Sequence, residues 1–303
     1  MQQRRREFDL AAYLRRVGLD AAASGDYPAD SVKTLSIVMG AQAHAVPFEN
    51  LDVVVGHTIS MKPGDIEDKL VHRRRGGYCF EVNTLLRLAL DALGFTNVEP
   101  MLCRVRYNKP EHTMLAPSHM VLKVSCDDGN QYLADVGFAG NGVPEPIDLA
   151  AREAVLHKHG CFRVRPYARA GCTAVLQKRR RDSNDVPTGD ASLDSDWIDC
   201  YIFNPDIYCE PADLELCNWG SCTMPGARFT SQLFAHCVKP DSTHYVSAGS
   251  VIVAAPDVAS TLLTVLLVVL LFVLPHPSKG SKRRPRHSPP GGRWLARGGE
   301  AHN

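Results

Sequence analysis

Cys79 is the residue of this sequence with the clearest capacity for covalent chemistry. It follows Gly76-Gly77-Tyr78 and opens a segment whose apolar residues recur at helical spacing, so it lies at a predicted helix N-terminus. Free N–H groups and the helix dipole at such a position favour a thiolate over a thiol, and they can hold a developing oxyanion. Since a single cysteine is more often a buried apolar residue, this interpretation needs partners.

His119 and Asp135 are the two residues that could be those partners. His119 opens an alternating segment, 119–125, and Asp135 lies near the end of the next one, 131–136. The residues 127–130, Asp-Asp-Gly-Asn, predict a hairpin between them, which places the two side chains roughly opposite each other. A carboxylate there can orient an imidazole that forms an ion pair with a thiolate. A buried Asp in an apolar strand also needs such a partner.

The spacing of apolar residues, which predicts the elements that position these residues, changes near Gly94. Before it, apolar residues recur at helical spacing, whereas after it they alternate in several consecutive segments. We therefore predict a helical part, 1–94, carrying the cysteine, and a small sheet or barrel, 95–205, carrying the histidine and the aspartate. The predicted helices begin near Asp9, Ser31, Asp65, Cys79 and Pro211, and the predicted strands are Val98–Arg106, His119–Ser125, Gln131–Val136, Cys161–Arg165, Thr173–Lys178 and Trp197–Phe203.

Composition excludes several classes of protein. With 303 residues, 45% of them hydrophobic, the chain can bury a sizeable core in about two domains and is not mainly disordered. The net charge is +1 and the basic runs are short, so we expect no nucleic-acid partner. The ten cysteines form no CxxC pair, and the N-terminus has no apolar signal region. These features predict reduced cysteines, no metal site and a cytoplasmic protein.

Three motifs, in this order, closely resemble those of the arylamine N-acetyltransferases. They are RGGYCFEVN at 75–83, SHMVLKV at 118–124 and YLADVGF at 132–138, and VPFENL at 46–51 is similar to the family's N-terminal motif. The resemblance spans about residues 7–245. It implies an α+β fold with a helical N-terminal domain, a central β-barrel and a small α/β third domain, and a cysteine-protease-like Cys-His-Asp arrangement.

The resemblance also implies a reaction. Cys79 would be the nucleophile, His119 the general base and ion-pair partner, and Asp135 the orienting carboxylate. Acetyl-CoA would donate an acetyl group to Cys79, and an arylamine or arylhydrazine would accept it on nitrogen, in a ping-pong cycle of xenobiotic metabolism. No metal takes part, and the small-molecule acceptor and coenzyme A are the only expected partners of a monomer.

The remaining site residues follow from the same resemblance. Ser118, His119 and Phe138 are expected to line the acceptor pocket, and Gly220 and Gly226 are expected to contact coenzyme A. Two departures from the family pattern concern these regions. Ala139 stands where the family usually has a glycine, and Ala227-Arg228 replaces a hydroxyl position of the coenzyme A segment. Arg228 could instead meet a phosphate.

The C-terminal part departs further. We assign 206–257 to a partial third domain or lid, 258–274 to an uncharged apolar segment, and 275–303 to a disordered basic tail. The resemblance is lost after Tyr245. The segment 258–274 is compatible with a membrane anchor, with a buried element of the third domain, or with a C-terminus foreign to the family. A transmembrane helix needs about 20 apolar residues, so we favour a cytoplasmic protein over an anchored one.

Two other functions stay open at this point. A papain- or transglutaminase-like cysteine hydrolase uses the same Cys, His, Asp order. Alternatively, the altered segment 218–229 predicts a catalytically weakened family member with a defective coenzyme A site.

Overall fold

The computed structural model describes residues 8–20, 26–107, 109–110, 112–138, 143–151, 153–157, 160–180, 196–239, 242–247 and 250–254. The apolar segment 258–274, the basic tail 275–303 and Ala139 lie outside the described residues. The chain divides into two units, Met1–Pro256 and Asp257–Asn303, and every element below belongs to the first. No helix within the described ranges is long and apolar enough to cross a membrane.

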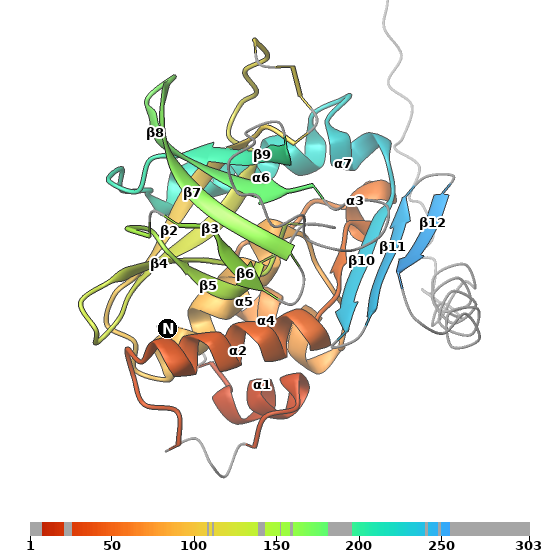
Figure 1. The fold of residues 1–303 in the computed structure, drawn as a ribbon. Coiled ribbons are helices and arrows are strands. Elements are labelled where there is room, and N and C mark those ends of the chain that lie inside the picture. The colour runs from red at the N-terminus through yellow and green to blue at the C-terminus, as the bar shows by residue number, and fades with distance from the viewer. Residues whose placement is uncertain are drawn as a thin grey trace, which may run out of the picture. The chain divides into compact units, whose positions relative to one another are not determined.

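Most of the helices lie in the first 94 residues, as predicted (Figure 1). They are α1 (Leu10–Val17), α2 (Val32–Ala45), α3 (Leu51–Val54), α4 (Pro63–Glu67), the π-helical turn η2 (Asp68–His72) and α5 (Cys79–Ala92). The Asp9 side chain accepts the N–H of Ala12 at 2.8 Å and so caps α1. The third predicted helix begins at Pro63 rather than Asp65, because proline suits the first turn of a helix.

Eight antiparallel strands form a nearly closed, barrel-like sheet in the middle of the chain (Figure 1). Their order is β5 (Val143–Asp148), β4 (Gln131–Asp135), β3 (His119–Ser125), β2 (Val98–Val105), β9 (Trp197–Phe203), β8 (Cys172–Arg179), β7 (Gly160–Arg169) and β6 (Val155–His157). Strands β3 and β9 have the predicted bounds, and the turn between β3 and β4 is confirmed.

A second, four-stranded sheet follows in the order β1 (Phe48–Glu49), β10 (Phe234–Lys239), β11 (Ser242–Ser247) and β12 (Ser250–Ala254). Helices α6 (Pro211–Thr223) and α7 (Arg228–Ser231) precede β10. Strand β1 comes from the N-terminal part, which we predicted to be helical throughout. It pairs Phe48 with His236, so the first and last parts of the described chain share this sheet.

Helix α5 packs against β3, and the alternation of β3 divides its side chains between two cores. Met120, Leu122 and Val124 belong to the core shared with the helices, whereas Val121 belongs to the core inside the barrel. The first turn of α5 is therefore held against the strand that begins with His119.

Candidate active site

The structure brings His119 and Asp135 into direct contact. His119 Nε2 is 2.8 Å from Asp135 Oδ2, and both side chains are buried. The register of β3 and β4 pairs Leu122 with Ala134, so the two residues lie on a diagonal rather than directly opposite as predicted. Because the contact uses Nε2, the imidazole has Nδ1 left for a further partner.

Asp135 is held by four hydrogen bonds from four different parts of the chain. Oδ2 accepts from His119 and from the Tyr201 hydroxyl, the latter at 3.0 Å, and Oδ1 accepts from Asn83 Nδ2 at 3.0 Å and from the Gly137 N–H at 2.8 Å. Burial opposes ionisation, but the charge and hydrogen bond of His119, together with these donors, lower the pKa of Asp135. The carboxylate is therefore both charged and fixed in orientation.

Cys79 is the first residue of α5 and is 1% exposed. Its Sγ lies 3.9 Å from the backbone oxygen of Ser118, the residue before His119. All ten cysteines lie in the described part of the chain, and all are free thiols. No group of three or more His, Cys, Asp or Glu side chains within the described ranges is placed to hold a metal ion.

The imidazole of His119 is favoured in its protonated form. Burial opposes protonation, but the charge and hydrogen bond of Asp135, followed by the hydrogen bond and charge of Cys79, raise the pKa of His119 from 6.5 to about 10. A cationic imidazole between a carboxylate and a thiol is the arrangement that stabilises a thiolate.

We expect the charged His119 to stabilise the fold until the pH rises through about 10. With a folded-state pKa raised from 6.5 to about 10, this contribution is fully present below pH 6.5 and is lost as the pH rises through 10. Urea unfolding of the wild type and of His119→Gln should show a difference in free energy of unfolding that shrinks across this range. A difference that stays constant with pH would contradict the ion pair.

The residues expected to line the acceptor pocket surround this histidine. The Phe138 ring lies 5.1 Å from the His119 ring and 5.2 Å from the Tyr201 ring, measured between centroids. Ser118 is half-buried, and its N–H donates to the Cys103 oxygen at 3.1 Å. The structure thus places Ser118 and Phe138 beside the Cys-His-Asp group, while their contact with an acceptor stays a prediction.

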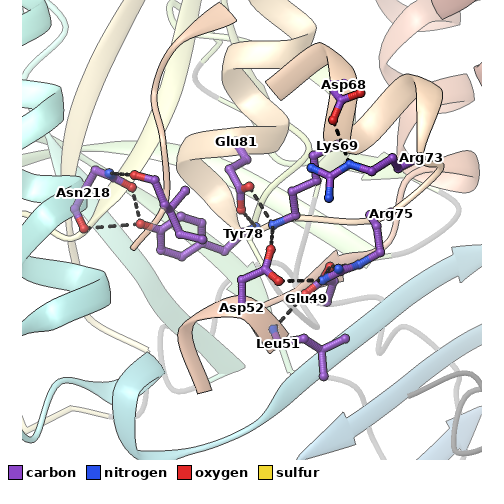
Figure 2. Close-up of polar contacts among 11 residues, drawn as sticks. Glu49, Leu51, Asp52, Asp68, Lys69, Arg73, Arg75, Tyr78, Glu81 and Asn218 are labelled. Carbon is purple, nitrogen blue, oxygen red and sulfur yellow. Dashed lines mark hydrogen bonds and ion pairs between the residues drawn. The ribbon is translucent and has the colours of Figure 1, made fainter. Parts of the chain in front are cut away.

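The residues expected to contact coenzyme A lie on and after α6. Gly220 is inside α6, and Gly226 has a φ of +78° in the turn before α7, so that turn favours glycine. Arg228 is exposed, and its guanidinium lies 4.7 Å from the centre of the Phe234 ring. Helix α6 is tied to the residue before the nucleophile, because the Tyr78 hydroxyl donates to the Asn218 side chain (Figure 2).

Sequence reasoning missed Asn83, Gly137 and Tyr201 as parts of this site. Asn83 donates to Asp135 and to the Met120 backbone oxygen, and its own side-chain oxygen accepts the N–H of Val136 at 3.0 Å. Asparagine is a poor residue for a helix interior, so its position four residues after Cys79 was the available signal. Tyr201 lies in an apolar strand 66 residues from Asp135 and gave no such signal.

Comparison with known proteins defines the class of protein. A family model described as N-acetyltransferase matches residues 31–264, so the match continues beyond Tyr245, where we expected the resemblance to end. An arylamine N-acetyltransferase of Mycolicibacterium smegmatis is 33% identical over 242 residues, covering 78% of each chain. An arylamine N-acetyltransferase / N-hydroxyarylamine O-acetyltransferase of Salmonella typhimurium is 33% identical over 225 residues, covering 74% of this chain and 71% of the relative.

Solved structures agree with these sequences. The M. smegmatis arylamine N-acetyltransferase has a TM-score of 0.70 at 30% identity, over 87% of this chain and 91% of the other. The Mycobacterium marinum arylamine N-acetyltransferase in complex with CoA has a TM-score of 0.72 at 27% identity, over 88% and 93%. The chain therefore belongs to the arylamine N-acetyltransferase family, and it is an acyltransferase with the α+β fold that its sequence predicted.

Proposed function

We propose that this protein transfers an acetyl group from acetyl-CoA to the nitrogen of arylamines or arylhydrazines through a thioester at Cys79. The observation that carries the proposal is the bond between His119 Nε2 and Asp135, which leaves Nδ1 for the thiol at the start of α5. The M. marinum relative, solved in complex with CoA, supports coenzyme A as the carrier of the acetyl group.

In the first half of the reaction, the Cys79 thiolate attacks the carbonyl carbon of acetyl-CoA. A carbon–sulfur bond forms to Cys79, the bond to the coenzyme A sulfur breaks, and the protonated His119 gives its proton to the leaving thiolate. The proposal assigns the oxyanion of the tetrahedral intermediate to N–H groups in the first turn of α5. Asp135 keeps the imidazole oriented while it loses and regains its charge.

In the second half, the amine attacks the acetyl-Cys79 carbonyl. The neutral His119 takes the proton from the attacking nitrogen, the thioester bond breaks, and the thiolate–imidazolium pair is restored. Ser118 and Phe138 are proposed to line the acceptor side, beside the His119 ring. The aromatic faces of Phe138 and Tyr201 suit a flat aromatic amine.

The proposal includes the division of the chain that its sequence suggested. We propose a helical domain, 1–94, a barrel domain, 95–205, and a third domain over 206–257. The arrangement of β2 to β9 over 98–203 supports the middle boundaries. A monomer in the cytoplasm, acting in xenobiotic metabolism, completes the proposal.

Intact-protein mass spectrometry after exposure to acetyl-CoA is the direct test. The wild type and Cys126→Ser, which changes a buried cysteine outside the RGGYCFEVN motif, should each gain one acetyl group and lose it when an arylamine is added. Cys79→Ser should gain none. Loss of the acetyl group to water alone would instead indicate a hydrolase, and labelling of the Cys79→Ser protein to the wild-type extent would contradict the proposal.

The same experiment addresses the departure at Ala227-Arg228. If the coenzyme A site is defective, an activated acetyl ester should label Cys79 while acetyl-CoA does not. Equal labelling by both donors would show that the altered segment still accepts the coenzyme.

A further inference from the structure

Five charged side chains form a charge cluster beside the turn that precedes the nucleophile (Figure 2). Lys69 Nζ lies 2.8 Å from Glu81 Oε1 and 2.7 Å from Asp52 Oδ2. The Arg75 guanidinium lies 2.8 Å from Glu49 Oε1 and 3.2 Å from Asp52 Oδ1. Lys69, Glu49 and Glu81 are buried, so their charges must be neutralised by partners within the cluster, whereas Asp52 and Arg75 are partly exposed.

Glu81 connects this charge cluster to the turn. Its Oε2 accepts the N–H of Tyr78 at 3.1 Å, and its side chain lies over Gly77, where an added Cβ would be 2.8 Å from Glu81 Oε2. Glu81 is the third residue of α5, so this is the carboxylate half of a capping box. Tyr78 directly precedes Cys79 in the chain. The hydrogen bond from the Tyr78 N–H to Glu81 therefore helps to set the position of the nucleophile.

The Glu81 carboxylate carries its charge in the first turn of the helix that begins with Cys79, and Lys69 lies against it. Glu81 lies two residues from Cys79 and is 3% exposed, so its charge is poorly screened by water. An uncompensated negative charge there would disfavour a thiolate on Cys79. Lys69, itself buried, donates directly to Glu81 and supplies the opposite charge.

The cluster has one more carboxylate than it has cations. It has two cations, Lys69 and Arg75, and three carboxylates, Glu49, Asp52 and Glu81. Burial raises the pKa of Glu81 to about 7, although the charge and hydrogen bond of Lys69 and the Tyr78 N–H act in the opposite direction. Burial also opposes the charge of Lys69, but the charges of Glu81 and Glu49 and the hydrogen bonds of Asp52 and Glu81 raise its pKa.

We propose that Lys69 and Glu81 act together as a positioning pair for Cys79. Glu81 fixes the backbone that leads into the nucleophile, and Lys69 orients Glu81 and cancels its charge, so that the cap does not repel the thiolate. The inference rests on the proposed function, in which Cys79 is the reacting thiol. Neither residue is expected to touch the acetyl donor or the amine.

The rate of Cys79 alkylation by iodoacetamide, measured against pH with peptide mapping, tests this pair. Lys69→Met should move the alkylation profile of Cys79 to higher pH by about one unit, which slows the reaction about tenfold below the midpoint. Glu81→Gln has one amide oxygen to accept the Tyr78 N–H and gives up the acceptor for Lys69, and because it removes the negative charge it should move the profile to lower pH. Lys69→Arg should restore most of the wild-type profile, because it keeps the charge.

Two further variants make the result decisive. Arg73→Gln is the matched control, because Arg73 lies on the same segment and pairs at 2.8 Å with Asp68, where both side chains are 57% exposed. Its profile should overlay that of the wild type. If Lys69→Met does not fold, Lys69→Met/Glu81→Gln removes the unpaired carboxylate, and its profile should lie close to that of the wild type.

Opposite shifts are the signature of charge compensation. A general loosening of the turn would slow alkylation in both single variants without displacing their profiles in opposite directions. Profiles of Lys69→Met and Glu81→Gln that coincide with that of the wild type, or that shift in the same direction, would overturn the inference. Alkylation does not require acetyl-CoA, so an absence of acetyl labelling would count against the proposed function and leave this test intact.

Discussion

Asp135→Asn is expected to lower the rate of acetyl transfer by about 10⁴-fold, the loss that the same change produces in serine triads. The substitution keeps the shape of the side chain and removes its charge. It also replaces one acceptor oxygen by an NH2 group, which cannot accept a hydrogen bond. Each carboxylate oxygen accepts two hydrogen bonds, Oδ2 from His119 and Tyr201 and Oδ1 from Asn83 and Gly137, so one of these two pairs of donors loses its acceptor. The imidazole then loses both its orientation and the charge that stabilises its protonated form.

Stability should fall as well, because buried donors lose their acceptor. An unsatisfied buried polar group costs about 1–3 kcal/mol, which urea unfolding can resolve from the wild type. Single-turnover acetylation of the folded variant separates the catalytic loss from this destabilisation. Asp127→Asn, an exposed aspartate in the same hairpin, is the matched control and should change neither quantity measurably. A folded Asp135→Asn protein with wild-type activity would remove Asp135 from the proposed mechanism.

The strands that carry His119 and Asp135 could be predicted because their signals are local. Alternation over 119–125 and an Asp-Asp-Gly-Asn turn define a hairpin without knowledge of the rest of the fold. His119 and Asp135 are offset by two residues along the register, because the hairpin is centred on residue 128 whereas the midpoint of the two residues is 127. The contact survives this displacement, since diagonal neighbours on one face remain within reach of long side chains.

The partners of Asp135 from other elements could not be predicted in the same way. Asn83 comes from α5 and Tyr201 from β9, and only the packing of α5 against β3 and the closure of the barrel-like sheet bring them together. Strand β1 was missed for a related reason. Two residues are too few to show an alternation, and β1 forms because β10, which follows 185 residues later, offers a pairing edge.

Lys69 and Glu81 illustrate how a charged pair can escape sequence reasoning. Charged residues near a helix start usually indicate a solvated face, and the short basic run at 73–75 is of this kind in the sequence. The structure separates these residues. Arg73 is exposed and pairs with exposed Asp68, whereas Lys69 is buried against Glu81. The sequence spacing does not show which of Lys69 and Arg73 is buried. That depends on the position of α3, whose Asp52 pairs with Lys69.

Gly137→Ala is expected to lower the rate of acetyl transfer by about 100-fold, through a displacement of the nucleophile rather than a loss of any reacting group. A Cβ at Gly137 would lie 2.8 Å from the Cys79 Cα and 2.9 Å from Asn83 Nδ2 and from Val82 Cγ2. The closest of these atoms belongs to the backbone of α5 and cannot turn aside. The methyl group therefore pushes the start of α5 away from the segment after β4, and overpacking of this kind costs about 1–3 kcal/mol of stability.

The displacement moves Cys79 away from His119 and Asp135. Gly137 follows Asp135 by two residues and donates its N–H to it, and the Cys79 Cα is the atom that an added Cβ would meet. Steady-state acetyl transfer and urea unfolding of the same preparation measure both effects. Gly64→Ala is the matched control, since a Cβ there meets nothing within 4 Å in the exposed first turn of α4, and the change should leave activity unaltered and raise stability by about 0.5–1 kcal/mol. If Gly137→Ala retains wild-type activity, the backbone contact does not set the position of Cys79. If its activity and its stability both fall, the start of α5 has been displaced at the cost that the close approach predicts.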